Sequence, residues 1–248
     1  HSAVAVARAT LAAATPSLDP AVAAAARAAI AEEVLPCLCD KASGRGGGRD
    51  LIYVGFGSTS ATMVDAAANF ARVAQRVAAQ TGCNLLLHAC GCKDLRDAWY
   101  KALFGYHTIE ATYVDEAALT NDLGWKEDGA GVTTVQIVSR DLPLQRVFAA
   151  CTAVVHHGGA GTCATALCAA TPSLITPRLF DQFSWAERLE DAGAAVRIDI
   201  DIGASELAAA IRRAIRCRQR CEELSAAIRA EDALGVASGH VVDAVAGG

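Results

Sequence analysis

A local design that occurs twice, an apolar strand followed by a glycine-rich turn and then a helix, constrains the fold of this chain most strongly. The first copy spans residues 51–61 and contains the turn GFGS at 55–58. The second copy spans residues 153–169 and contains the turn HHGGAGT at 156–162. In an open sheet of parallel strands, such turns follow the carboxyl ends of the strands, and ligands bind at that edge. The sequence therefore predicts a ligand site assembled from both turns.

The rest of the chain after residue 50 repeats the alternation of strands and helices. Short apolar runs predict strands at 51–54, 85–87, 133–138, 153–155, 173–176 and 195–198, with one more candidate at 108–114. The helix after the first turn carries apolar residues at helical spacing, namely Met63, Ala67, Phe70, Ala74 and Val77. Strands that alternate with helices favour right-handed crossovers and a parallel sheet covered on both faces. We therefore predict an α/β, Rossmann-like fold.

Two regions are predicted along the chain. Residues 1–50 form an N-terminal helical segment, with a helix at 21–35, followed by a glycine-rich linker at 41–49. Residues 51–248 form the Rossmann-like domain. Within that domain, residues 91–131 have the least regular pattern and are interpreted as an insertion.

Composition excludes several classes of protein. The chain has 53% hydrophobic residues and a formal net charge of −5, which argue against disorder and against nucleic-acid binding by bulk charge. No run of about 18 apolar residues predicts a transmembrane helix. The 10 cysteines are interpreted as mostly buried thiols in a reducing compartment. Their spacing does not bring four ligands together, so we predict no metal site.

The second turn has the chemistry of a phosphate site. A helix N-terminus offers unpaired N–H groups and a partial positive charge, and glycines let an anion approach the backbone. One interpretation is that His157 or His156 donates to a phosphate while Thr162 adds its hydroxyl and N–H; ordinary packing of the histidines is the alternative. The first turn lacks the third glycine of a dinucleotide fingerprint. Gln75 and Arg76 stand where a dehydrogenase would have its acidic ribose ligand.

A second candidate group follows at Asp181 and Gln182. A carboxylate beside a carboxamide supplies several acceptors and two donors, which suits adjacent hydroxyls of a sugar. The alternative is that Asp181 is the N-cap of the helix that contains Trp185 and Leu189.

The run from residue 154, VVHHGGAGTCATALCAATPSLITPRLFDQFSWAERLEDAGAAV, resembles the donor-binding motif of UDP-glycosyltransferases. It is most similar to the sterol glucosyltransferase branch, which has the same double histidine, GGAGT, two spaced prolines, DQ and W-x-x-R. The resemblance spans about residues 51–245. It implies the C-terminal half of a two-domain GT-B glycosyltransferase, with a UDP-sugar as co-substrate and no other cofactor.

The resemblance also implies roles for individual residues. The diphosphate would be bound by His157, Gly159, Ala160, Gly161 and Thr162, with Ser58 approaching from the first turn. The turn at Val138, Ser139 and Arg140 would present its backbone to the uracil, and Asp181 and Gln182 would bind the sugar hydroxyls. Thr165 stands where plant members have a ribose-binding glutamate, and no Trp lies near Val138.

The catalytic base of such enzymes, usually a histidine, belongs to the N-terminal acceptor domain. Too few residues precede Leu51 to form that domain, so we predict no catalytic residue in this chain and no transfer by the chain alone. The expected function is binding the donor for an inverting enzyme that transfers a hexose, glucose in the first instance, to a lipid or sterol hydroxyl. The alternatives are the donor-half subunit of a split N-acetylglucosaminyltransferase and a non-catalytic nucleotide-sugar-binding module.

The expected partners are UDP-glucose or a related UDP-sugar and an acceptor domain or partner subunit, with no nucleic acid. The expected location is the cytoplasm. A basic helical surface is predicted from Arg212, Arg213, Arg216, Arg218 and Arg220. We interpret it as a solvated face, with peripheral contact to a membrane surface as the alternative.

Overall fold

A six-stranded parallel sheet forms the centre of the domain in the computed structural model, which describes residues 50–104, 135–139, 142–231 and 233–246. The strands are β1 (Leu51–Gly55), β2 (Asn84–His88), β3 (Val135–Val138), β4 (Ala153–His156), β5 (Ser173–Ile175) and β6 (Ala195–Arg197). They match the six apolar runs and confirm the α/β prediction. The predicted N-terminal helix, the linker and the strand at 108–114 lie outside the described residues.

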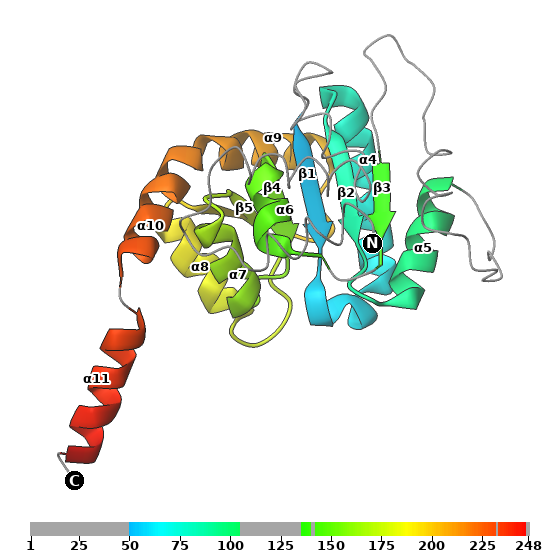
Figure 1. Cartoon of the computed structure of the whole chain (residues 1–248). Helices are drawn as coiled ribbons and strands as arrows, with labels where there is room; N and C mark the ends of the chain where they lie inside the picture. The colour runs from blue at the N-terminus through cyan, green and yellow to red at the C-terminus, as the bar shows by residue number, and fades with distance from the viewer. Residues whose placement is uncertain (1–49, 105–134, 140–141, 232, 247–248) are drawn as a thin grey trace, which may run out of the picture.

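The order of the strands places the two glycine-rich turns side by side. The order is β3-β2-β1-β4-β5-β6. β2 and β3 are added in turn on one side of β1, and β4, β5 and β6 are added in turn on its other side. The order therefore reverses between β1 and β4, which is where ligands bind in doubly wound sheets. Gly55 at the end of β1 pairs with His156 at the end of β4. Both turns emerge at this carboxyl edge, in the lower part of Figure 1.

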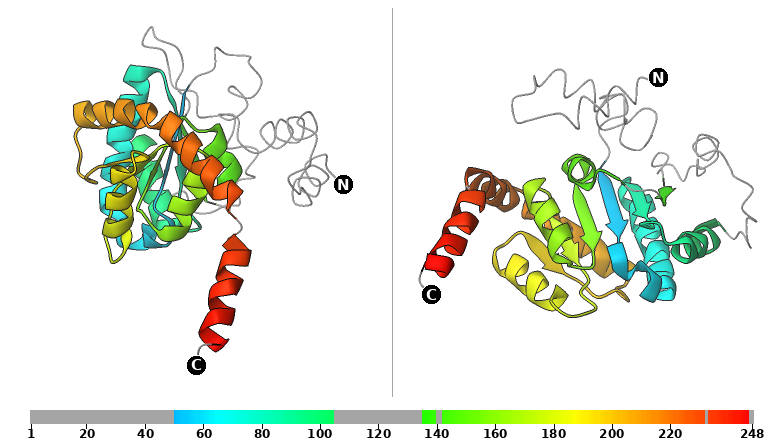
Figure 2. Two further views of the ribbon diagram at one scale, coloured as in Figure 1. Left: turned by 90° about the vertical axis from the view of Figure 1, so that its left-hand side faces the viewer. Right: turned by 60° about the horizontal axis from the view of Figure 1, so that its bottom comes forward.

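Helices cover both faces of the sheet (Figure 2). In chain order they are α4 (Val64–Thr81), α5 (Lys93–Phe104), α6 (Leu144–Ala150), α7 (Ala160–Cys168), α8 (Gln182–Asp191), α9 (Ala204–Arg216), α10 (Arg218–Ala230) and α11 (Ala233–Ala246). The larger core lies between the sheet and α4, α5 and α9. The opposite face packs mainly against α6, α7 and α8.

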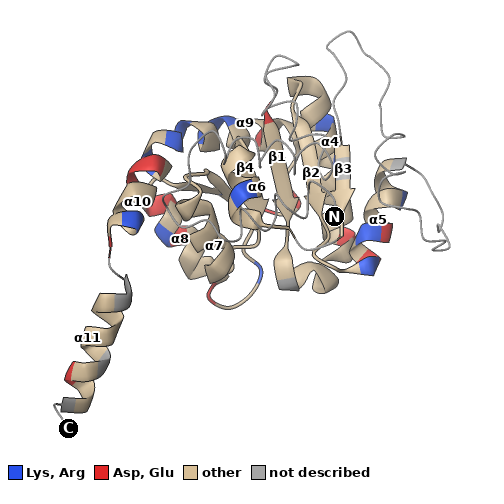
Figure 3. Cartoon of the chain, viewed as in Figure 1, with Lys and Arg blue, Asp and Glu red and all other residues tan. Residues whose placement is uncertain are grey.

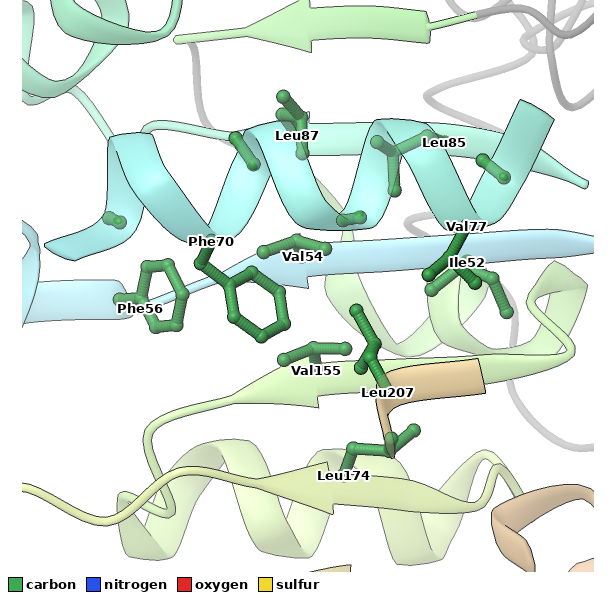
Figure 4. Packing of buried hydrophobic residues seen from close by; sticks show 14 of the residues in the cluster. Ile52, Val54, Phe56, Phe70, Val77, Leu85, Leu87, Val155, Leu174 and Leu207 are labelled. Carbon is green, nitrogen blue, oxygen red and sulfur yellow. The ribbon is translucent and has the colours of Figure 1, made fainter. Parts of the chain in front are cut away.

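The alternation of side chains along the strands explains the two cores. Val54 and Leu87 point toward α4, as Figure 4 shows, whereas Tyr53 and Leu86 belong to the core on the other face. Phe70 of α4 is 1% exposed and stacks edge-on against Phe56, with ring centroids 6.1 Å apart. All five residues predicted to form the apolar face of α4 are buried.

The first glycine turn differs from the prediction because it does not lead directly into an α-helix. A 3-10 helix, η1 (Gly57–Thr62), comes first, and α4 begins only at Val64. The hydroxyls of Thr59, Ser60 and Thr62 each donate to the carbonyl three residues earlier, at 2.6, 2.7 and 2.8 Å. These local bonds stabilise the tighter turn. Only the second glycine turn therefore presents an α-helix N-terminus at the carboxyl edge.

The arginines of α9 and α10, blue in Figure 3, are partly used within the protein. Arg218 donates to the carbonyls of Cys151, Thr152 and Ala170 at 2.9 to 3.0 Å. Arg220 donates to the carbonyl of Ala192 at the end of α8. Arg212 and Arg216 are exposed. The predicted basic surface is therefore smaller than the count of arginines indicated.

The last helix, α11, extends away from the body of the domain (Figure 1). Its exposed apolar residues include Val236, Val242 and Val245. Across the described part of the chain, no helix has both the length and the apolar character needed to span a membrane.

Candidate functional site

The N-terminus of α7 lies at the point where the strand order reverses. Its N-cap, Gly159, has no side chain to cap the helix. The first amide with a helical partner is that of Cys163, which donates to the carbonyl of Gly159. The amides of Ala160, Gly161 and Thr162 therefore precede the first hydrogen bond of the helix. Ala160 and Gly161 are exposed, so a ligand can reach this positive end of the helix dipole.

His157 joins the two glycine-rich turns. A Cβ atom at position 57 would lie 2.8 Å from Cε1 of His157, and one at position 159 would lie 2.5 Å from its Nε2. The ring therefore fits between Gly57 and Gly159 only because both lack a side chain. Gly57 also has a φ of +54°, which favours glycine. The site thus depends on a contact between residues 100 positions apart in the sequence.

Both histidines of the second turn are neutral at physiological pH. Burial lowers the pKa of His156 to about 3, with a smaller lowering by His157. Burial also lowers the pKa of His157, while the negative charge of Asp181 acts in the opposite direction. Nδ1 of His156 accepts a hydrogen bond from the N–H of Gly158 at 3.1 Å, so its proton resides on Nε2. Neutral imidazoles and amide dipoles, rather than cations, line this part of the edge.

Several buried polar atoms at the same edge have no hydrogen-bond partner in the described part of the chain. They are Nε2 of His156, Nδ1 of His157 and Oγ of Ser139. A buried polar atom without a partner costs about 1–3 kcal/mol. Ser139 follows β3, His156 is the last residue of β4, and His157 follows it. Their position at the carboxyl edge is typical of a site that binds a polar ligand.

The predicted nucleoside contact lies at the end of β3. The carbonyls of Val138 and Ser139 accept hydrogen bonds from the amides of Ala89 and Gly91, at 2.8 and 2.7 Å. Each carbonyl keeps a second lone pair. Arg140 lies outside the described residues, as does the side chain of Ser58, which belongs to η1. The nucleoside roles of Val138, Ser139 and Arg140 stay predictions.

Asp181 is the N-cap residue of α8, as the alternative interpretation predicted, but its side chain does not cap the helix. It makes no side-chain cap bond; its Oδ2 accepts from the indole N–H of Trp185 at 3.1 Å. Asp181 is exposed and its charge acts on His157, so its carboxylate lies near the second glycine turn. It is available to sugar hydroxyls.

Gln182 is buried and has a structural role that the sequence did not indicate. Its Oε1 accepts from the amides of Arg178 and Leu179 at 2.9 and 3.0 Å, which orders the loop before α8. Its predicted contact with the sugar stays a prediction. Thr165, in place of the ribose-binding glutamate, donates its hydroxyl to the carbonyl of Gly161 at 2.7 Å.

A buried polar group near the site was missed at the sequence level. The hydroxyl of Tyr53 lies 2.9 Å from Nδ1 of His88, and burial is the main cause that raises the pKa of Tyr53. A Cβ at Gly55 would lie 2.3 Å from that hydroxyl, so Gly55 makes room for the ring. Gly55, the first glycine of the turn, was the sequence feature that could have indicated this close approach of the Tyr53 ring. Among the described residues, no group of three metal-ligating side chains could hold a metal ion.

Comparison with known proteins shows the family. Residues 114–245, more than half of the chain, match the family described as the C-terminal domain of erythromycin biosynthesis protein CIII-like proteins. A sterol 3-beta-glucosyltransferase of Arabidopsis thaliana is 44% identical over 75 residues, which are 29% of this chain and 12% of that enzyme. The tylactone mycaminosyltransferase of Streptomyces fradiae is 35% identical over 124 residues, which are 48% of this chain and 26% of that enzyme.

Solved structures show the same fold. The glycosyltransferase VinC, solved in complex with DTDP, has a TM-score of 0.52 at 22% identity, over 81% of this chain and 42% of that one. The glycosyltransferase of kitacinnamycin has a TM-score of 0.52 at 22% identity, over 75% of this chain and 40% of that one. This chain therefore spans less than half the length of the glycosyltransferases it matches. It belongs to the CIII-like C-terminal-domain family of glycosyltransferases, which confirms the glycosyltransferase resemblance of the run at residues 154–196, and it has the fold of the C-terminal half of a GT-B enzyme.

Proposed function

We propose that this chain is the donor-binding domain of an inverting, UDP-sugar-dependent glycosyltransferase. The observation that carries the proposal is the uncapped N-terminus of α7, which lies beside both glycine turns where the strand order reverses. An exposed helix start without a capping side chain is a ready anion site. The diphosphate would accept hydrogen bonds from the amides of Ala160, Gly161 and Thr162, with His157 and Ser58 close by.

The same arrangement supports departure of the nucleotide. In transfer, the bond between the anomeric carbon and the β-phosphate oxygen breaks, and negative charge increases on the diphosphate. Amide dipoles aimed at that charge stabilise the transition state more than the ground state. The nucleoside would extend toward Val138–Arg140, and the sugar toward Asp181 and Gln182, on the other side of the diphosphate.

The complete reaction needs groups from an acceptor domain or partner subunit. A base there would remove the proton from the acceptor hydroxyl, which attacks the sugar. We propose a hexose, glucose first, as the transferred group and a lipid or sterol hydroxyl as the acceptor. The name of the Arabidopsis relative supports this choice. We further propose that the chain alone binds the donor without transferring the sugar, and that it acts in the cytoplasm.

Calorimetry with UDP tests the binding proposal directly. We expect saturable binding below millimolar UDP, and a loss of about tenfold or more in affinity for His157→Asn and His157→Ala. His240→Ala is the matched control, because this exposed histidine lies on α11, outside the site. Absence of UDP binding at millimolar ligand by folded wild-type protein would refute the proposal.

A further inference from the structure

Phe180, the residue before Asp181, is strained and exposed at the same time. Its φ is +49°, in the left-handed region that a bulky residue rarely adopts. The residue is 88% exposed, so burial of the ring does not offset the strain. Both properties disfavour the folded state, and a strained residue at a ligand edge is a candidate for direct contact with the ligand.

The loop that carries Phe180 is ordered by hydrogen bonds between the residues before and after it. The side-chain oxygen of Gln182 accepts from two amides that precede Phe180. A Cβ at Gly158 would lie 3.2 Å from the carbonyl oxygen of Gln182, so the loop packs directly against the second glycine turn. Phe180 is thus presented by a fixed backbone beside the diphosphate site.

Electrostatic effects place the adjacent carboxylate near the same helix end. The charge of Asp181 opposes the lowering of the pKa of His157, and it adds to the burial that raises the pKa of Cys163 to about 12. His157 precedes α7 and Cys163 lies in its first turn, so Asp181 is close to the helix end proposed to hold the diphosphate. The sugar attached to that diphosphate would therefore lie near residues 180 and 181.

We propose that Phe180 is a sugar-binding residue whose ring stacks on the apolar C–H face of the donor hexose. A pyranose has an apolar face and a polar rim, and binding sites match such ligands with an aromatic surface beside a few polar groups. Phe180 supplies the surface, and Asp181 accepts hydrogen bonds from the hydroxyls of the rim. This inference rests on the proposed donor-binding function and adds a residue that determines affinity for the sugar.

The test separates the sugar from the nucleotide. Calorimetry would measure UDP, UDP-glucose, UDP-galactose and UDP-N-acetylglucosamine with wild-type protein and with Phe180→Gly. We expect unchanged UDP affinity, and a loss of about fivefold for the hexose donor that wild type binds best. The melting temperature should rise, since glycine adopts a positive φ without strain. Phe180→Asn, which also tolerates this φ, should lose the same sugar affinity.

Ala170→Gly is the matched control. Ala170 has a φ of +53° but precedes β5, at the opposite edge of the sheet. It should raise the melting temperature and leave all four affinities unchanged.

A ratio of UDP-hexose to UDP affinity that is the same in wild type and Phe180→Gly would overturn the inference while the donor-binding proposal stands. An equal loss of UDP and UDP-hexose affinity would overturn it too, because that pattern indicates a structural role. Wild-type protein that fails to bind UDP would refute the donor-binding proposal itself, and this inference with it.

Discussion

Side chains at the amino edge of the sheet, where the strands begin, bond to main-chain carbonyls of the protein, whereas three buried polar atoms at the carboxyl edge have no partner in the described residues. At the amino edge, Arg218 donates to three carbonyls, and the hydroxyl of Thr171 donates to the carbonyl of Phe148 at 2.7 Å. At the carboxyl edge, His156, His157 and Ser139 each have an unpaired buried atom. The difference indicates that one edge contributes stability and the other is built for a ligand.

The largest loss of stability is expected at Gly57, because the ring of His157 occupies the space that a side chain at position 57 would need. Gly57→Ala introduces strain at a positive φ and a clash with His157, and should cost about 3 kcal/mol of unfolding free energy and abolish UDP binding. Gly82→Ala is the control: Gly82 has a φ of +72° and no neighbour within 4 Å of the added Cβ, so it should cost about 1 kcal/mol. Denaturant unfolding measures both. Equal losses would show that the contact with His157 is unimportant.

At the amino edge, Arg218→Ala should cost about 2–3 kcal/mol, because three carbonyls lose a charged donor. UDP affinity should not change, since the guanidinium lies at the edge opposite the site. Arg212→Ala, an exposed change on α9, should alter stability by less than about 0.5 kcal/mol. If Arg218→Ala lost both stability and UDP affinity, the amino edge would not act separately from the ligand site at the carboxyl edge.

Acid should destabilise the protein through the carboxyl edge. His156 has a folded-state pKa of about 3 and an ordinary value of 6.5, and the pKa of His157 is also lowered. Below about pH 6.5 the unfolded chain therefore binds more protons than the folded one. The stabilisation is present above that pH and is lost as pH falls toward 3, by about 1.4 kcal/mol per pH unit for His156, and His157 acts in the same direction.

His156→Asn tests the contribution of His156 alone, because it removes the titrating group at this position. Its side-chain oxygen can still accept from the amide of Gly158, but it does not titrate. The slope of unfolding free energy between pH 6 and pH 4.5, measured in urea, should fall by about 1.4 kcal/mol per unit relative to wild type. An unchanged slope would mean that His156 is not held neutral in the folded state.

Among the variants at the carboxyl edge, Gly161→Ala should change stability least, and its effects on stability and on UDP binding should have opposite signs. A Cβ there would meet no atom within 4 Å, so Gly161→Ala should raise the unfolding free energy by about 0.5–1 kcal/mol. The methyl group would stand at the exposed helix start and should reduce UDP affinity. Ala164→Gly, exposed and one turn further along α7, should show the opposite pattern: lower stability and unchanged affinity. Retained UDP affinity in Gly161→Ala would place the diphosphate elsewhere.

Local patterns were sufficient to predict the six strands, because fully buried parallel strands such as Leu51–Gly55 are short continuous apolar runs. They were also sufficient to identify the two turns and the family motif. Local patterns did not predict η1, because the hydroxyls of Thr59, Ser60 and Thr62 form a turn that competes with the α-helix. The loop-ordering role of Gln182 and the strain at Phe180 gave no signal in the sequence.

The chain by itself determined the parallel α/β class, the positions of the glycine turns and the glycosyltransferase motif, because apolar periodicity and glycine act within a few residues. Only the tertiary structure decided that His157 fits between Gly57 and Gly159 and that Arg218 donates to the loops before β4 and β5. It also decided that buried atoms of His156, His157 and Ser139 lie at the carboxyl edge without a partner in the described residues. These features depend on contacts between distant segments, and the order of strands that brings those segments together follows from packing of the whole sheet.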